Sequence, residues 1–161
     1  MEPRIEMLSE KKLVGKSIKM SLENNKTTQL WKSFMSNRQS INNIVNSDLY
    51  SIQIYDNTLN FKGFNLATKF DKWAAIEVDS FDLIPNGMKA YSLKSGLYAV
   101  FVHKGPTSEF QKTFQYIFGQ WLPFSDYILD KRAHFELLGE KYKNNSPDSE
   151  EEVWIPIKPK A

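Results

Sequence analysis

The residue whose type and setting most favour chemistry is Glu136, in the run His-Phe-Glu-Leu-Leu over 134–138. The run predicts a strand on which Glu136 and Leu138 share one face. A carboxylate in an apolar sheet is costly unless it is paired or meets a cation. That cost favours binding of a cationic ligand, and it raises the pKa of the carboxyl group toward that of a general acid. The alternative is a glutamate at a sheet edge that is paired with lysine or arginine.

Aromatic side chains could form the walls of a pocket around such a carboxylate, since they make up 14% of the chain. Indole and phenol faces attract cations and flat aromatic molecules. The candidate ligand-binding residues beside Glu136 are Trp121, Trp154, Trp73, Tyr55 and Glu152, the last because it shares the face of Trp154. The alternative for each ring is a place in the core. For Glu152 a solvated acidic run is an equal alternative, and for Glu150 and Glu151 it is the favoured interpretation.

Composition excludes several other kinds of site. The chain has no cysteine and two histidines, at 103 and 134, so we predict no metal site and no cofactor. Neither a P-loop nor a Gly-x-Ser-x-Gly elbow occurs. The 21 basic and 19 acidic residues form no long basic run, so we expect no direct nucleic-acid binding. Without an apolar stretch of membrane-spanning length or a signal-peptide pattern, we expect a cytoplasmic protein with no membrane partner.

The elements that would position these residues follow one order twice: strand, helix, strand, strand. In the first half the strands are expected at 15–22, 49–55 and 74–78, with a helix capped by Thr27 or Thr28 and a loop over 56–70. In the second half they are expected at 97–104, 134–140 and 153–157, with a helix capped by Thr107 or Ser108 and ended by Pro123. This order predicts one α+β domain of two β-α-β-β repeats, at about 1–82 and 83–161. Paired, they form one curved antiparallel sheet with two helices on one face and a central cleft on the other.

The last strand indicates which side chains turn toward that cleft. Val153, Ile155 and Ile157 share one face of this strand and are expected to meet the helices, which turns Glu152 and Trp154 to the opposite face. The match between repeats places Trp73 on that face as well.

Four segments of the second half carry a further signal. They are Gly-Leu-Tyr-Ala-Val-Phe-Val-His-Lys-Gly-Pro at 96–106, Tyr-Ile-Phe-Gly-Gln-Trp-Leu-Pro at 116–123, His-Phe-Glu at 134–136 and Glu-Val-Trp-Ile-Pro-Ile at 152–157. In this order they resemble the GyrI-like, or AraC-type effector-binding, domain family. The first half matches in layout. The resemblance implies the duplicated fold above and gives Glu136 the place of the glutamate in the family's strand motif.

The resemblance implies binding of small amphipathic molecules, aromatic and often cationic, between rings and a buried carboxylate, as in multidrug sensing or sequestration. With no helix-turn-helix segment before Arg4, the chain is expected to be a free-standing bacterial member. Two alternatives stay open. One is a hydrolase of strained cyclopropane electrophiles, in which Glu136 is the catalytic residue. The other is a protein-interaction module whose partner is gyrase or a separate regulator.

Overall fold

The computed structural model describes residues 1–56 and 63–161, so part of the loop expected over 56–70 lies outside the described residues. The strands are β1 (Arg4–Leu8), β2 (Lys11–Met20), β3 (Ile44–Ile54), β4 (Phe70–Val78), β5 (Lys89–Leu93), β6 (Gly96–Lys104), β7 (Tyr127–Leu129), β8 (His134–Leu138) and β9 (Glu150–Pro159). The helices are α1 (Thr27–Asn37), α2 (Phe110–Tyr116) and α3 (Leu122–Phe124), with a π-helical turn over Ile117–Trp121 between the last two. Short 3-10 turns cover Arg38–Ser40 and Thr107–Glu109.

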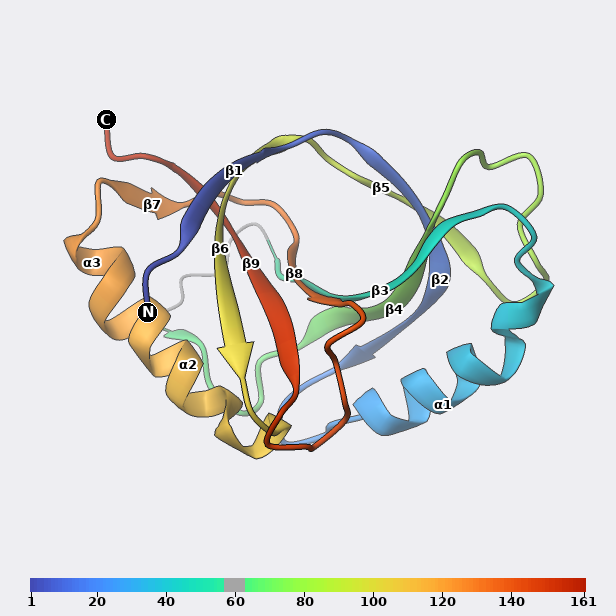
Figure 1. Cartoon of the computed structure of the whole chain (residues 1–161), viewed down its shortest axis with the longest axis horizontal. Helices are drawn as coiled ribbons and strands as arrows, with labels where there is room; N and C mark the ends of the chain where they lie inside the picture. Colours follow the sequence, from blue (N-terminus) through green and yellow to red (C-terminus); the bar gives the residue numbers. More distant parts are fainter. Residues whose placement is uncertain (57–62) are drawn as a thin grey trace.

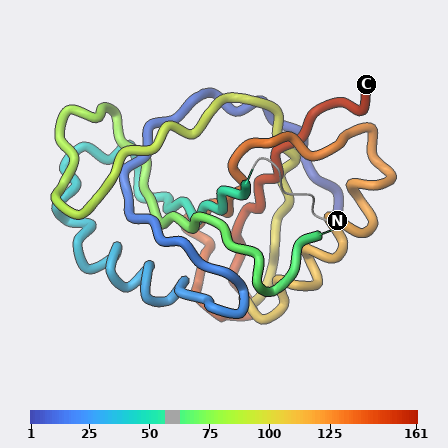
Figure 2. Tube along the Cα trace, turned by 180° about the vertical axis from the view of Figure 1, so that it is seen from behind, coloured from blue at the N-terminus to red at the C-terminus, as the bar shows by residue number. Residues whose placement is uncertain are grey.

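The strands form a curled antiparallel sheet in the order β1-β6-β9-β8-β3-β4-β2-β5, with β7 paired to β9. The two helical segments lie on one side of this half-barrel, below the sheet in Figure 1. Seen from behind, both chain ends lie on the side of α2 and α3 (Figure 2). These features confirm the expected α+β class with a curved antiparallel sheet and two helices. The element order β2-α1-β3-β4 recurs as β6-α2-β8-β9, while the repeat boundaries stay a prediction.

Each helix covers one flank of the sheet. The α1 helix buries Leu30 and Phe34 against β2 and β4 residues such as Val14 and Ile76. The prediction that Thr27 or Thr28 caps this helix is wrong. Thr27 is already the first helical residue, and Lys26 occupies the N-cap position without a side-chain hydrogen bond. The amphipathic pattern therefore fixes where this helix packs, and its start does not depend on a cap.

The second helical segment packs on the other flank. Ile117 is fully buried against Phe101, Val153 and Ile155, and the rings of α2 lie around it. The expected direction of the aliphatic residues on β9 is thus confirmed. No helix among the described residues has both the length and the apolar character needed to cross a membrane.

The opposite, concave face of the sheet is filled by a second core. Its largest members are Tyr50, Trp73, Tyr98, Phe135 and Trp154. The rings of Phe135 and Trp154 stack with their centroids 5.2 Å apart. Aromatic pairs add to the free energy gained by burial, so this core stabilises the curl of the sheet, and its rings occupy the face on which the central cleft was expected.

Candidate functional site

A cavity of about 1040 Å³ opens on the helix-bearing face, between α1 and α2. The helices cover the two flanks, so the central strands β3 and β8 are left without a helix above them. Its aromatic and thioether lining residues are Met20, Trp31, Met35, Tyr55, Phe70, Phe110, Phe114 and Tyr142. Its floor is formed by Ser51, Gln53, Lys72, Glu136, Leu138 and Glu151. Strand alternation explains this polar floor, because the residues between them, such as Ile52 and Leu137, belong to the core on the other face or pack against it.

Glu136 lies at the centre of the floor and is only 9% exposed. Gln53 Nε2 donates a hydrogen bond to Glu136 Oε1 at 3.1 Å. Lys72 is 7% exposed, and its Nζ lies 4.0 Å from the same oxygen. Burial raises the pKa of Glu136, against the opposing effects of Lys72 and of the Gln53 hydrogen bond. Burial likewise lowers the pKa of Lys72, against the attraction of Glu136 and Glu151.

Glu151 brings a second carboxyl group to the floor. Burial, and then the charge of Glu136, raise its pKa to about 7, while Lys72 acts in the opposite direction. A carboxyl group with such a pKa exchanges its proton near neutral pH. The interpretation of Glu151 as part of a solvated acidic run is therefore wrong, since β9 directs this half-buried side chain into the cavity.

Tyr55 forms one end of the cavity. Its ring lies 5.2 Å from that of Phe70 and 5.0 Å from that of His134, between centroids. Burial and the charge of Glu136 raise the pKa of the Tyr55 phenol, so the group stays neutral at physiological pH.

Of the candidate residues, the structure brings Glu136 and Tyr55 together and places the others elsewhere. In the pairing of β8 with β9, Glu136 lies opposite Val153, and Phe135 lies opposite Trp154. Trp154 and Trp73 consequently belong to the core of the concave face. The expectation that these rings share a cleft with Glu136 opposite the helices is therefore wrong.

Trp121 and Glu152 also lie away from the cavity. The Trp121 ring packs edge-on against Phe101 in the core beneath α2, with centroids 5.2 Å apart. A Glu152 oxygen accepts a hydrogen bond from Arg4 Nη2 at 2.8 Å, and its other oxygen accepts one from Trp154 Nε1 at 3.0 Å. Both residues have structural partners on other parts of the sheet.

Sequence reasoning missed Lys72, Gln53 and Glu151 on the floor. The sequence did contain a signal for Lys72. It directly precedes Trp73 on β4, so the two side chains point to opposite faces and Lys72 lies on the helix side. Among the described residues, no group of three or more histidine, aspartate or glutamate side chains could hold a metal ion. The floor is thus a set of charged organic groups under aromatic walls.

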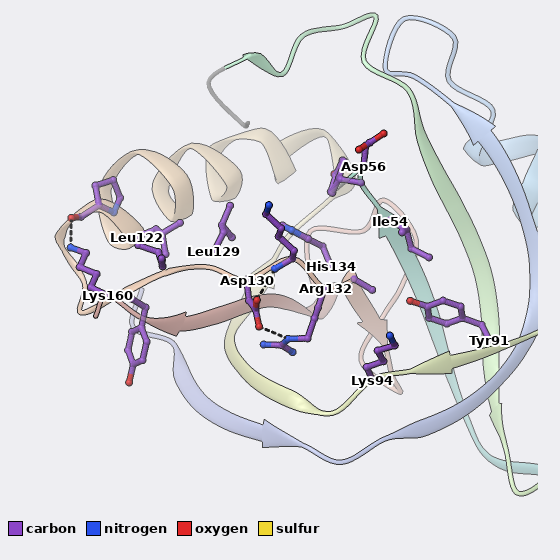
Figure 3. A pocket seen from close by; sticks show the side chains of 16 residues that line it. Ile54, Asp56, Tyr91, Lys94, Leu122, Leu129, Asp130, Arg132, His134 and Lys160 are labelled. Atoms are coloured by element: carbon purple, nitrogen blue, oxygen red, sulfur yellow. Dashed lines mark hydrogen bonds and ion pairs between the residues drawn. The ribbon is translucent and has the colours of Figure 1, made fainter. Parts of the chain in front are cut away.

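A second cavity, of about 690 Å³, lies at one end of the half-barrel (Figure 3). Its charged lining residues are Lys94, Lys131, Arg132, Lys160, Asp56 and Asp130. Basic groups outnumber acidic ones here, so this cavity suits a cation less well than the cavity between the helices.

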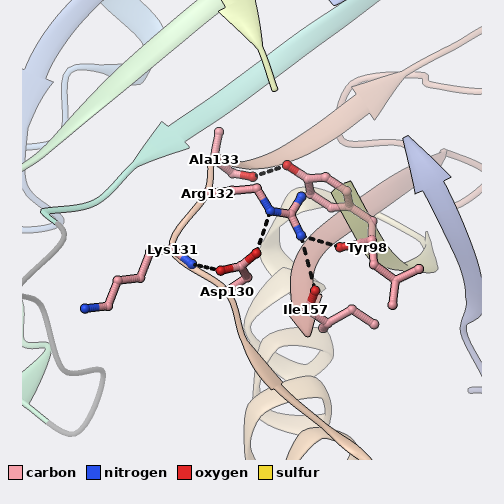
Figure 4. Close-up of polar contacts among 7 residues, drawn as sticks. Tyr98, Asp130, Lys131, Arg132, Ala133 and Ile157 are labelled. Carbon is pink, nitrogen blue, oxygen red and sulfur yellow. Dashed lines mark hydrogen bonds and ion pairs between the residues drawn. The ribbon is translucent and has the colours of Figure 1, made fainter. Parts of the chain in front are cut away.

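The main charged group of the second cavity is already engaged in holding the chain segment that leads into β8 (Figure 4). Arg132 Nε donates to Asp130 Oδ2 at 2.8 Å, and Nη2 donates to the carbonyl oxygen of Leu97 at 2.6 Å. The guanidinium carbon lies 4.7 Å from the centre of the Tyr98 ring, and Tyr98 donates to the Ala133 carbonyl oxygen at 2.7 Å. This network fixes the start of β8 and, through it, the position of Glu136.

Solved structures with similar folds include one complex with a small molecule and one hydrolase. SAV2435 bound to tetraphenylphosphonium has a TM-score of 0.73 at 19% identity, covering 98% of this chain and 94% of that chain. The EcmrR C-terminal domain has a TM-score of 0.72 at 13% identity, with 98% of each chain covered. A hydrolase encoded by lin2189 from Listeria innocua has a TM-score of 0.59 at 12% identity, covering 98% and 92%. At these identities the likeness shows the fold.

No curated protein matches the chain. The model of the GyrI-like small molecule binding domain, in contrast, matches residues 1–158, which is nearly the whole sequence. The match agrees with the resemblance seen in the second half of the sequence, with the curled sheet and with the cavity between the helices. The chain belongs to the family of GyrI-like small-molecule binding domains.

Proposed function

We propose that the cavity between α1 and α2 binds amphipathic aromatic cations. The observation that carries this proposal is a floor with two carboxyl groups, Glu136 and Glu151, beneath a wall of aromatic rings. An organic cation in this cavity would bury its rings against the wall and neutralise charge on the floor. The tetraphenylphosphonium complex of SAV2435 supports this class of ligand.

The walls suit compounds of several shapes. The cavity volume of about 1040 Å³ is at the upper end of the range for drug-sized ligands. Trp31 and Met35 of α1 and Phe110 and Phe114 of α2 contribute hydrophobic contacts with little directional preference. A thioether adapts to different neighbours. We therefore propose multidrug binding, in sensing or sequestration, rather than recognition of one metabolite.

Calorimetric titration with tetraphenylphosphonium and tetraphenylborate tests the proposal, because the two ions share a shape and differ in the sign of charge. We expect the cation to bind at least about tenfold more tightly than the anion. Trp31→Ala removes an aromatic ring from the wall and is expected to weaken binding of the cation by about tenfold. Equal affinity for both ions, or no binding of either, would refute the proposed function.

A second candidate function is hydrolysis of strained cyclopropane electrophiles, favoured by the neutral-range pKa of Glu151 beside Glu136. In this reaction a carboxylate takes a proton from water as the water oxygen bonds to a ring carbon. The electron pair of the broken carbon–carbon bond passes into a conjugated carbonyl group, which is then protonated. Mass spectrometry of such a compound incubated with the protein tests this candidate. A ring-opening rate equal to that without protein excludes it.

A further inference from the structure

The floor of the cavity carries opposite charges at matched positions of the two halves. Matching 74–78 of β4 with 153–157 of β9 sets Lys72 against Glu151, each two residues before the matched segment. Both side chains line the cavity, one on each side of the central strands β3 and β8. The floor therefore contains a fixed ammonium group in addition to its two carboxyl groups.

We propose that Lys72 is a built-in counter-ion for Glu136, so that the cavity selects ligands with one positive charge over ligands with two. The inference rests on the proposed function and names the charge class of the ligand. Glu136 is engaged from two sides, by Gln53 at 3.1 Å and by Lys72 at 4.0 Å. Glu151 is left to neutralise the cation of the ligand.

The burial of the pair makes it costly for a ligand to displace Lys72. Both side chains are about nine-tenths buried, so separating them would leave a desolvated charge without a partner. A covalently tethered ammonium also competes at a high effective concentration against any free cation. Glu151 forms no ion pair within 4.0 Å among residues 1–56 and 63–161, and it is less buried than Glu136. It is therefore the carboxyl group open to a ligand.

The surroundings of Glu151 agree with this division of roles. The titratable groups that face it are Lys72 on β4, Glu136 on β8, Tyr142 after β8 and His103, its cross-strand partner on β6. His103 is already bound to Thr113 Oγ1 at 2.7 Å and to the Pro106 carbonyl oxygen at 3.2 Å. Of these groups, Lys72 is the basic one that lines the cavity, and it is held by Glu136; a second lysine, Lys32, lines the cavity from α1.

Ethidium and propidium provide the test, because they share one ring system and carry one and two positive charges. Fluorescence titrations use nucleic-acid-free wild type, Lys72→Met and the control Lys19→Met, whose lysine is exposed on β2 and pairs with Asp71. We expect the wild type to bind ethidium at least as tightly as propidium. Lys72→Met should shift the affinity ratio at least about tenfold toward propidium, and Lys19→Met should leave it within about twofold.

The outcomes separate this inference from the proposed function. An unchanged ratio in a folded Lys72→Met variant, with ethidium still bound, overturns the counter-ion role and leaves the proposed function intact. No binding of either dye or of tetraphenylphosphonium to the wild type overturns both. If Lys72→Met does not fold, Glu151→Gln gives a second test. This variant should weaken ethidium binding at least about tenfold, and unchanged ethidium affinity would overturn the inference.

Discussion

The two halves of the domain build the same arrangement of elements and place different chemistry on it. Where the first half has Ser51 and Lys72 on the floor of the cavity, the matched positions of the second half carry Glu136 and Glu151. Strand alternation is enough to direct all four side chains to the same face. The difference teaches that the duplicated fold supplies the shape of the site, while its polarity comes from a few substitutions between equivalent strand positions.

The walls of the cavity also differ between the two halves of the domain. The α1 helix offers Trp31 and Met35 to the cavity, and α2 offers Phe110 and Phe114, whose rings lie 4.5 Å apart between centroids. Phe118 continues this row, 6.0 Å from Phe114. The second half thus contributes both carboxyl groups and a row of rings, so a bound cation is expected to place its charge toward β8 and β9.

The largest expected effect comes from making the two halves alike in charge. Lys72→Glu places a third carboxyl group on the floor and removes the counter-ion of Glu136. We expect a loss of about 4 kcal/mol in the free energy of unfolding, because breaking a buried ion pair leaves charges without compensation. Urea denaturation at neutral pH measures it.

The exchange variant Lys72→Glu/Glu151→Lys is the matched control, since it restores one lysine and two glutamates with the halves interchanged. It should recover at least about half of the lost stability. A double variant no more stable than Lys72→Glu would show that the two positions are not equivalent in their surroundings.

A loss of stability in acid should also arise from the second half of the domain. Burial, and then the charge of Arg132, lower the pKa of His134 from 6.5 to about 3. Its matched position in the first half is Leu49, which does not titrate. The folded state excludes a proton that the unfolded chain binds, so this contribution to stability is present above pH 6.5 and lost as the pH falls toward 3. The loss should reach about 3 kcal/mol by pH 4.

Thermal or urea unfolding of wild type and His134→Leu over this pH range isolates the effect as the difference between two curves. Subtraction matters because Glu151, with a pKa raised from 4.5 to about 7, contributes stability that is present below pH 4.5 and lost as the pH rises through 7. Parallel curves for the two proteins would contradict the role given to His134.

A smaller effect concerns how closely the first strand of each repeat packs against its neighbours. A Cβ atom at Gly15 on β2 would collide with the carbonyl oxygen of Ala74 on β4. The matched position on β6 is Leu97, a half-buried side chain on the core beneath α2. We expect Gly15→Ala to cost about 2 kcal/mol through overpacking, and Leu97→Ala to cost about 1 kcal/mol through lost contacts. Denaturation midpoints that rank the two variants in reverse would contradict this comparison.

Much of the fold could be predicted from the sequence, because alternation and helical periodicity are local signals. The strand pattern of Val153, Ile155 and Ile157 correctly indicated the side that meets α2. The relation between strands was harder to predict from the sequence. Whether Glu136 and Trp154 share a face depends on the register of β8 against β9, and a shift of one residue reverses the answer. Of the rings predicted to surround Glu136, Tyr55 lines the same cavity, whereas Trp73 lies on the opposite face of the sheet.

The smallest expected effect tests that register directly, with two adjacent glutamates. Glu152→Gln should change stability by no more than about 0.5 kcal/mol, because its partner Arg4 is exposed and such pairs contribute little. It should also leave the affinity for tetraphenylphosphonium within about twofold, whereas Glu151→Gln should weaken it at least about tenfold. The same calorimetric titration measures both variants. If Glu152→Gln proved the more damaging to binding, β9 would present its other face to the cavity, and Trp154 would then belong to the wall that the sequence first suggested.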